Sequence, residues 1–199
     1  MYTEHTHYPV EQHPLPPFLP DEARLLMLGS FPPPRKRWCM DFFYPNPNNQ
    51  MWYIFGLLFY GDAERLVDRT SKSFRLPDIK KLLKEHGIAI FDTATAVCRL
   101  NDNASDKDLQ IVEKTDLPSL LAQIPQCRDI VCTGQKSFSV LTEDYGIAIP
   151  AMGEHNDFTL ASRPMHLWRM PSSSRAYPMK LEDKAEYYRK MLTAIGIMS

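Results

Sequence analysis

The sequence predicts an α/β protein built on a mainly parallel sheet, and two observations lead to this fold class. Short apolar segments typical of buried strands alternate along the chain with longer segments typical of helices. The first two apolar segments, Arg24–Leu28 and Ile88–Phe91, are apolar on both faces, as parallel strands covered by helices should be. The length of 199 residues is that of one domain.

Four strands and five helices are expected in chain order. The strands are Arg24–Leu28, Ile88–Phe91, Asp129–Thr133 and His166–Met170. The helices are Met51–Phe59, Pro77–His86 (which Gly87 ends), Leu117–Ile124, Gln135–Thr142 and the strongly amphipathic Leu181–Ile195. We expect residues 1–20 to form a Pro-rich arm, 21–199 to form a single α/β domain, and 142–163 to be a long connection within it.

Composition excludes several classes of protein. With 44% hydrophobic and 24% charged residues and a net charge of −1, the chain is globular rather than disordered. No apolar run approaches the ~20 residues that span a bilayer, so we expect a soluble, cytoplasmic protein. The cysteines are too scattered for a disulfide framework or a metal centre, and we expect neither metal nor cofactor. They are Cys39, Cys98, Cys127 and Cys132. The histidines His5, His7 and His13 are expected in a mobile tail.

Polar and turn-forming residues follow each predicted strand. These segments are Gly29-Ser30-Phe31-Pro32, Asp92-Thr93, Gly134-Gln135-Lys136 and Pro171-Ser172-Ser173-Ser174. Because open α/β sheets bind ligands beyond the carboxyl ends of their strands, we expect a binding site along this edge. Motifs typical of nucleoside triphosphate sites, dinucleotide sites, zinc proteases and nucleophile-elbow hydrolases are absent.

Residues 1–50 are unusually rich in proline and hence rigid, and residues 31–60 are aromatic and locally basic. Ten of the 17 prolines lie in residues 1–50, and ten of the 22 aromatic residues lie in 31–60. Serine hydroxyls, backbone N–H groups and basic side chains contact phosphates, so this edge suits DNA. Phe31 either stacks on a base or belongs to the core, and both interpretations stay open. A basic face is expected from Arg35, Lys36, Arg37, Arg163, Arg169 and Lys180.

Two consecutive amides, Asn48 and Asn49, precede the first predicted helix. Asparagine is a favoured helix N-cap, but capping needs only one of them. The other amide is then free to serve a ligand.

Three segments together resemble the uracil-DNA glycosylase superfamily, closest to its branch of hypoxanthine-DNA and mismatch-specific glycosylases. The first motif is similar to Gly29-Ser30-Phe31-Pro32. The second is matched by Tyr44, Pro47, Asn49 and Trp52, and the third by Pro171, Ser172, Ser174 and Ala176. A further family segment is similar to residues 87–99.

The resemblance implies a three-layer α/β/α fold whose central four-stranded parallel sheet has the order 2-1-3-4. It implies a monomeric glycosylase that removes a damaged or mispaired base, whether uracil, hypoxanthine or a mismatch, from double- or single-stranded DNA. Asn49 is the implied catalytic residue, and Asn48, one residue away, is expected to face the cap or solvent. Implied base-binding residues are Gly29, Ser30, Phe31, Pro32, Tyr44 and Asp92; implied DNA-binding residues are Arg35, Lys36, Pro171, Ser172, Ser173, Ser174 and Arg175. For Asp92, a role as a buried turn former stays equally open.

The chain departs from the family at one position that bears on activity. Several members carry a catalytic Asp or Asn where this chain has Phe31. An alternative is therefore an inactive relative that binds nucleic acid or a flipped base without cutting it.

Overall fold

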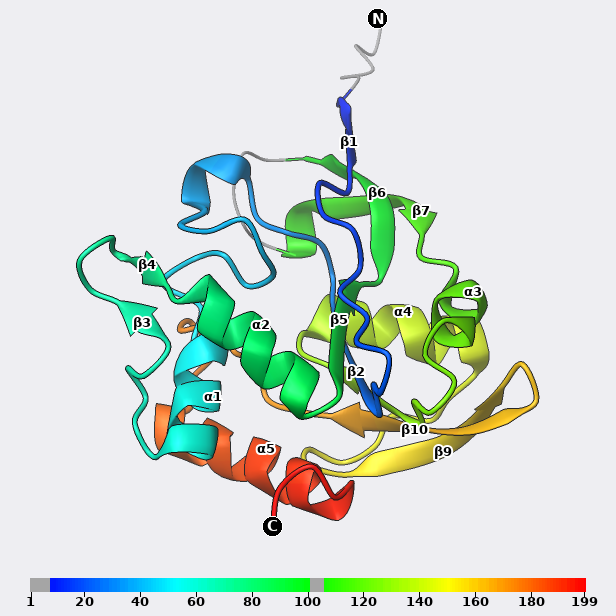
Figure 1. Cartoon of the computed structure of the whole chain (residues 1–199). Coiled ribbons are helices and arrows are strands. Elements are labelled where there is room, and N and C mark those ends of the chain that lie inside the picture. The colour runs from blue at the N-terminus through cyan, green and yellow to red at the C-terminus, as the bar shows by residue number, and fades with distance from the viewer. Residues whose placement is uncertain (1–7, 101–105) are drawn as a thin grey trace, which may run out of the picture.

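The computed structural model describes residues 8–100 and 106–199. Its central sheet has the strand order β5 (Ile88–Asp92), β2 (Leu25–Gly29), β8 (Asp129–Cys132), β10 (Arg163–Arg169), β9 (His155–Leu160) (Figure 1). Neighbours among the first four strands are parallel, whereas β9 pairs antiparallel with β10. The predicted mixed α/β class with a mostly parallel sheet is confirmed. The prediction of a four-stranded, all-parallel sheet is wrong, because β9 adds a fifth strand.

β9 falls in the segment that we expected to be a long connection. It joins β10 through a tight turn in which Ala161 and Ser162 have positive φ angles of 49° and 63°. Such turns usually contain Asn-Gly or Asp-Gly, which relieve the strain of positive φ. The turn between β9 and β10 contains neither dipeptide, so the hairpin could not be predicted from the sequence.

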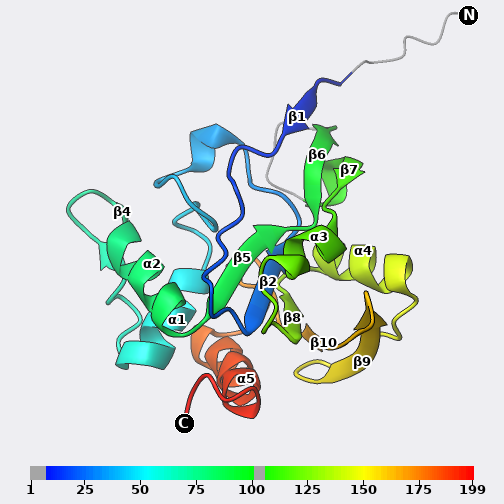
Figure 2. The same ribbon diagram turned by 45° about the vertical axis from the view of Figure 1, so that its right-hand side comes forward.

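All five predicted helices are present, with ends displaced by at most three residues. They are α1 (Met51–Tyr60), α2 (Leu76–Glu85), α3 (Leu117–Ala122), α4 (Gln135–Tyr145) and α5 (Leu181–Ala194). Helices α1, α2 and α5 lie on one side of the central sheet, and α3 and α4 on the other (Figure 2). Burial of Trp52, Phe55 and Tyr188 (each at most 1% exposed) fixes α1 and α5 in the core. No helix in the described ranges is long and apolar enough to cross a membrane.

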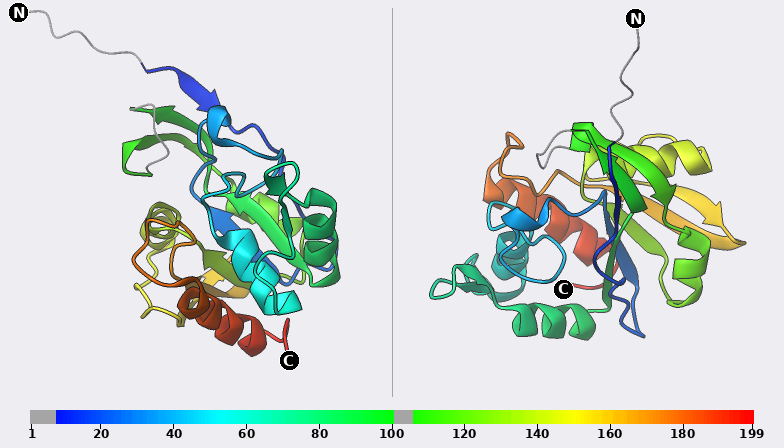
Figure 3. Two further views of the ribbon diagram at one scale, coloured as in Figure 1. Left: turned by 90° about the vertical axis from the view of Figure 1, so that its left-hand side faces the viewer. Right: turned by 90° about the horizontal axis from the view of Figure 1, so that it is seen from above.

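A smaller antiparallel sheet lies beyond the carboxyl ends of the central strands (Figure 3). Its order is β1 (Val10–Gln12), β6 (Ala94–Arg99), β7 (Leu109–Lys114). A two-stranded ribbon, β3 (Val67–Asp68) and β4 (Ser73–Phe74), and the 3₁₀ turns Arg35–Arg37 and Asp106–Asp108 complete the elements. The smaller sheet covers one side of the edge where the predicted site residues gather.

The N-terminal arm is held against the domain from residue 10 onward. β1 pairs with β6, and Phe18 forms an antiparallel bridge with Ile90 of β5. The expectation of a mobile tail is wrong for His13, whose side chain is 4% exposed. His5 and His7 lie outside the described residues.

The four cysteines are free, as the sequence predicts. Cys127 and Cys132 are buried, and burial raises the pKa of each thiol to about 12. Both thiols are therefore protonated at neutral pH and behave as small apolar side chains.

Candidate functional site

The segments that follow the four parallel strands meet at one edge of the sheet. The register pairs Gly29 with Asp92 across β2 and β5, and pairs Cys132 of β8 with both Leu28 and Arg169. The carboxyl ends of the four strands are therefore nearly level with one another along one edge of the sheet. The first motif begins at the end of β2 and the third follows the end of β10, whereas the second lies in the loop before α1 and at the start of α1.

Gly29 and Asp92 are in close contact at the ends of neighbouring strands. A Cβ atom at Gly29 would lie 2.2 Å from Asp92 Oδ1, so only glycine leaves room for this carboxylate. Asp92 is 7% exposed, and its Oδ2 accepts a hydrogen bond from His13 Nε2 at 2.9 Å. His13 lies 79 residues away in the arm, so no spacing rule could reveal it as a partner of Asp92.

Phe31 is a core residue of the smaller sheet. It is 8% exposed and packs with Ala94, Val97 and Leu109. Its ring also meets the His13 ring edge-on at 5.3 Å. The sequence left open whether Phe31 stacks on a base or belongs to the core, and the structure supports a place in the core.

The turn that contains Phe31 is fixed from two sides. Arg99 of β6 donates a hydrogen bond from Nη2 to the Pro32 carbonyl oxygen at 3.0 Å, and its Nε lies 3.1 Å from Glu11 Oε1 of β1. The Trp38 indole N–H donates to the Pro33 carbonyl oxygen at 2.7 Å. The first-motif backbone is therefore held in place before any ligand arrives.

Tyr44 reaches from the loop before α1 to the end of β8. Its backbone is left-handed, with φ 50°, and its hydroxyl lies 2.8 Å from Thr133 Oγ1. Burial raises the pKa of Tyr44 well above its ordinary value, with smaller contributions from Tyr188 and Asp92. Tyr44 is thus a neutral hydrogen-bonding group at the strand-end edge.

The second and third motifs meet through their backbones. Asn49 forms an antiparallel bridge with Ser174, and the Gln50 N–H donates to the Ser173 carbonyl oxygen at 2.8 Å. The expectation that capping leaves Asn49 free is wrong, since Asn49 Oδ1 accepts from the Met51 N–H, the first of α1, at 2.9 Å. Asn48 is exposed, as predicted. This hydrogen bond orients the side-chain amide of Asn49 and so fixes the direction of its NH₂ group.

Lys184 of α5 forms hydrogen bonds to both of these segments, a contact that the sequence did not suggest. The residue is 0% exposed, and its Nζ donates to Gln50 Oε1 and to the Ser174 carbonyl oxygen, each at 2.7 Å. Desolvation by burial lowers the pKa of Lys184. In the sequence, Lys184 is one of several charged residues of α5. Only the folded structure shows that it is buried while the others are not.

Replacing Lys184 by methionine is expected to lower the free energy of unfolding by about 1–2 kcal/mol, because two oxygens lose their donor. The gain from no longer burying a charge limits the loss. Lys190→Met, an exposed position on the same helix, is the matched control. Urea unfolding measures both variants; equal midpoints for the two would show that Lys184 does not hold the segments together.

The third motif divides into buried and exposed parts. Ser173 is 1% exposed and contributes its carbonyl oxygen, and Pro171 accepts a hydrogen bond from the Tyr188 hydroxyl at 3.2 Å. Ser174 and Arg175 are exposed, and Ser172 is half-buried. The exposed turn is therefore a surface on which hydroxyl and guanidinium groups face solvent.

The predicted basic residues lie in different places. Arg35 is exposed, stacks on Trp38 at 4.2 Å and pairs with Asp41 at 2.6 Å, and Lys36 is exposed beside it. Arg163 and Arg169 instead donate to backbone carbonyl oxygens within the fold. These two arginines have structural partners, which removes them from the predicted basic face.

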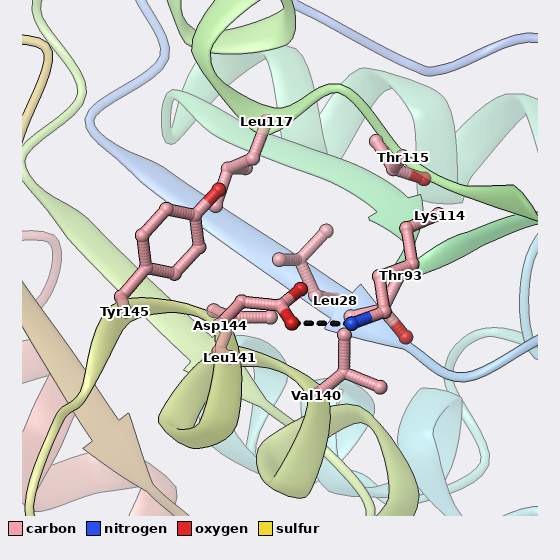
Figure 4. Close-up of a pocket in the computed structure, with 9 residues that line it drawn as sticks. All are labelled: Leu28, Thr93, Lys114, Thr115, Leu117, Val140, Leu141, Asp144 and Tyr145. Carbon is pink, nitrogen blue, oxygen red and sulfur yellow. Dashed lines mark hydrogen bonds and ion pairs between the residues drawn. The ribbon is translucent and has the colours of Figure 1, made fainter.

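A small cleft lies beside the strand ends, between β7 and α4 (Figure 4). Its wall is largely apolar, from Leu28, Leu117, Val140 and Leu141, and an ion pair between Lys114 and Asp144 crosses its mouth. None of the predicted site residues lines it. The cleft and the edge formed by the three motifs are separate features.

Comparison with solved structures finds a protein from Methanosarcina acetivorans, known from a solution NMR structure and named a "putative Uracil DNA glycosylase". The two structures match with a TM-score of 0.60, over 92% of this chain and 99% of the other, at 22% sequence identity. The two chains share a fold. No family model and no curated protein matches the sequence.

Proposed function

We propose that the protein is a DNA glycosylase, which hydrolyses the N-glycosidic bond of a damaged or mispaired base flipped out of DNA. The observation that carries this proposal is the backbone bridge between Asn49 and Ser174. It brings the second and third motifs of the resemblance together at the strand-end edge. The glycosylase name of the Methanosarcina protein, whose fold this chain shares, supports the same activity.

In this proposal the first motif and its neighbours hold the flipped base. Gly29, Ser30, Phe31 and Pro32 form a turn that is already fixed, so little entropy is lost on binding. When the bond from C1′ to the base nitrogen breaks, its electron pair leaves with the base. Fixed donors near the base stabilise that charge more than they stabilise the ground state. Tyr44 contributes a neutral hydroxyl, and Asp92 reads a ring N–H.

Asn49 orients the water that attacks C1′. Its Oδ1 already accepts from the Met51 N–H, so the amide NH₂ is held at one angle, next to the N-terminus of α1. An amide can orient water but cannot take its proton, which passes to the departing base or to solvent. Catalysis is therefore modest, and the reaction depends on an easily displaced base.

The third-motif turn and the 3₁₀ turn Arg35–Arg37 hold the phosphates that flank the flipped nucleotide. Ser172 and Ser174 offer hydroxyls, Pro171 and Ser173 fix the backbone, and Arg175 contacts phosphate or fills the gap in the duplex. Flipping costs a few kcal/mol, least for mispaired or damaged bases, which gives part of the selectivity.

The test is a glycosylase assay on duplex and single-stranded oligonucleotides that carry uracil, hypoxanthine or mismatched pyrimidines. Alkaline cleavage of the abasic site reports base release. We expect release from at least one lesion, and none from undamaged DNA. If no lesion is cut, the activity is absent.

A second candidate is a binding module that holds a flipped base or a single strand without cutting it. The burial of Phe31 at the position of the family's catalytic acid favours it. Lesion-specific binding without base release would support this candidate over the enzyme.

Arg175→Ala and Lys36→Ala are each expected to weaken binding to lesion-containing duplex and to flatten its salt dependence, because each cation that neutralises a phosphate releases counterions. Fluorescence anisotropy at several salt concentrations measures both effects. Lys81→Ala, on the exposed face of α2, is the control. Equal losses from all three variants would place the DNA elsewhere.

A further inference from the structure

Two histidines and an aspartate gather on one face of the β9–β10 hairpin. The register places Asp157 of β9 opposite His166 of β10, and His155 lies two residues before Asp157, hence on the same face. His166 is five residues before Pro171, or about 16 Å along an extended strand. The group is therefore distinct from the glycosylase site.

The distances between the three side chains are close to those of a metal site. Asp157 Oδ1 lies 3.5 Å from His155 Nε2 and 3.8 Å from His166 Nε2, and all three atoms lie within 4.8 Å of one another. Tetrahedral Zn²⁺, with bonds of about 2.0–2.1 Å to nitrogen, holds its ligand atoms roughly 3.3–3.5 Å apart. Small side-chain rotations reach this spacing.

His166 is oriented for metal binding by a carboxylate behind it. Asp129 of β8, which is 8% exposed, has its Oδ1 3.0 Å from His166 Nδ1 and 2.8 Å from Trp168 Nε1. An ionised carboxylate only accepts, so it keeps the proton of His166 on Nδ1 and leaves the lone pair of Nε2 outward. Metal-binding histidines commonly have such a carboxylate partner.

His155 is held by the same network. Its ring packs on the Trp168 ring at 4.4 Å, and Trp168 is itself fixed by its hydrogen bond to Asp129. One buried carboxylate thus positions two of the three ligands, directly or through one intermediate. This arrangement goes beyond a chance meeting of surface charges.

We propose that His155 Nε2, Asp157 Oδ1 and His166 Nε2 bind one divalent transition-metal ion of the class of Zn²⁺, Co²⁺ or Ni²⁺. Imidazole ligands select these ions over Mg²⁺ and Ca²⁺, which prefer oxygen. The ligand side chains are 37%, 79% and 40% exposed, so an ion reaches them from solvent and keeps water in its remaining positions. The bound ion ties the edge strand β9 to β10.

The experiment titrates the metal-free full chain with Co²⁺ and follows its visible absorbance and heat of binding. His5→Gln and His7→Gln are introduced first, to remove two imidazoles outside the described residues. We expect one Co²⁺ per chain. His155→Ala and His166→Ala should each weaken binding at least tenfold, while His86→Ala, at the end of α2, should bind as the parent does.

A second measurement uses thermal unfolding with Zn²⁺. At about 100 times the dissociation constant, the midpoint should rise by roughly 5 °C or more, and the rise should vanish in His155→Ala/His166→Ala. Absence of stoichiometric Co²⁺, or unchanged binding in both single histidine variants, overturns the proposal. Neither readout involves base release, so failure here is distinguishable from failure of the glycosylase proposal.

Discussion

Asn49→Ala lowers single-turnover base release at least about tenfold, equivalent to about 1.4 kcal/mol of barrier, on the proposed mechanism. The variant loses the amide that orients the attacking water. It also loses the acceptor for the Met51 N–H, so the free energy of unfolding should fall by about 1 kcal/mol. Binding to abasic DNA should change little, because the third-motif and basic contacts remain.

Asn49→Ser separates the two losses. A serine hydroxyl can accept from the helix N-terminus but offers no amide NH₂. We expect near parental stability with base release still reduced tenfold. Asn48→Ala, one residue away and exposed, should retain full activity. Full activity in Asn49→Ala, with loss in Asn48→Ala or Asp92→Ala, would show that the catalytic residue is misassigned.

Gly29→Ala is expected to lower the free energy of unfolding by about 1–3 kcal/mol and base release at least tenfold. The new Cβ would lie 2.2 Å from Asp92 Oδ1. Asp92 would have to move away from His13, which breaks a buried hydrogen bond. Urea unfolding and the single-turnover assay measure the two effects.

The double variant Gly29→Ala/Asp92→Ala tests the cause of the loss. If the collision is with the Asp92 side chain, the double variant should be about as stable as Asp92→Ala alone, since the second change removes the obstacle. Additive losses in stability would mean that Gly29 is required for another reason, such as its backbone conformation.

Much of the central architecture could be predicted because its signals are local. The strand Leu25–Gly29 is a continuous apolar segment, and Leu181–Ala194 has one apolar face, so each indicates its own structure. β1, with three residues, carries no periodic signal and exists because β6 offers it a partner. β9 alternates in burial, but its turn lacks the residues that usually mark a hairpin.

The candidate site was only partly predictable, for a related reason. Residues at or after strand ends could be assigned to one edge of the sheet, which explains why the positions of Gly29, Asp92 and Pro171 could be predicted. His13 and Lys184 act through partners 79 and 134 residues away, and neither stands in a recognisable spacing. His166 likewise meets Asp157 only because their strands pair. Long-range pairing of single polar side chains leaves no pattern in a lone sequence.

The N-terminal arm also has a consequence for how molecules of this protein behave toward one another. β5 is an outer strand of the central sheet, and Phe18 exchanges two backbone hydrogen bonds with its Ile90. β1 covers the open side of β6 in the same way. Uncovered strand edges recruit other strands and lead to aggregation or exchange of segments between chains. A truncation that begins after residue 20 would expose both edges at once, and we expect it to self-associate more readily than the full chain.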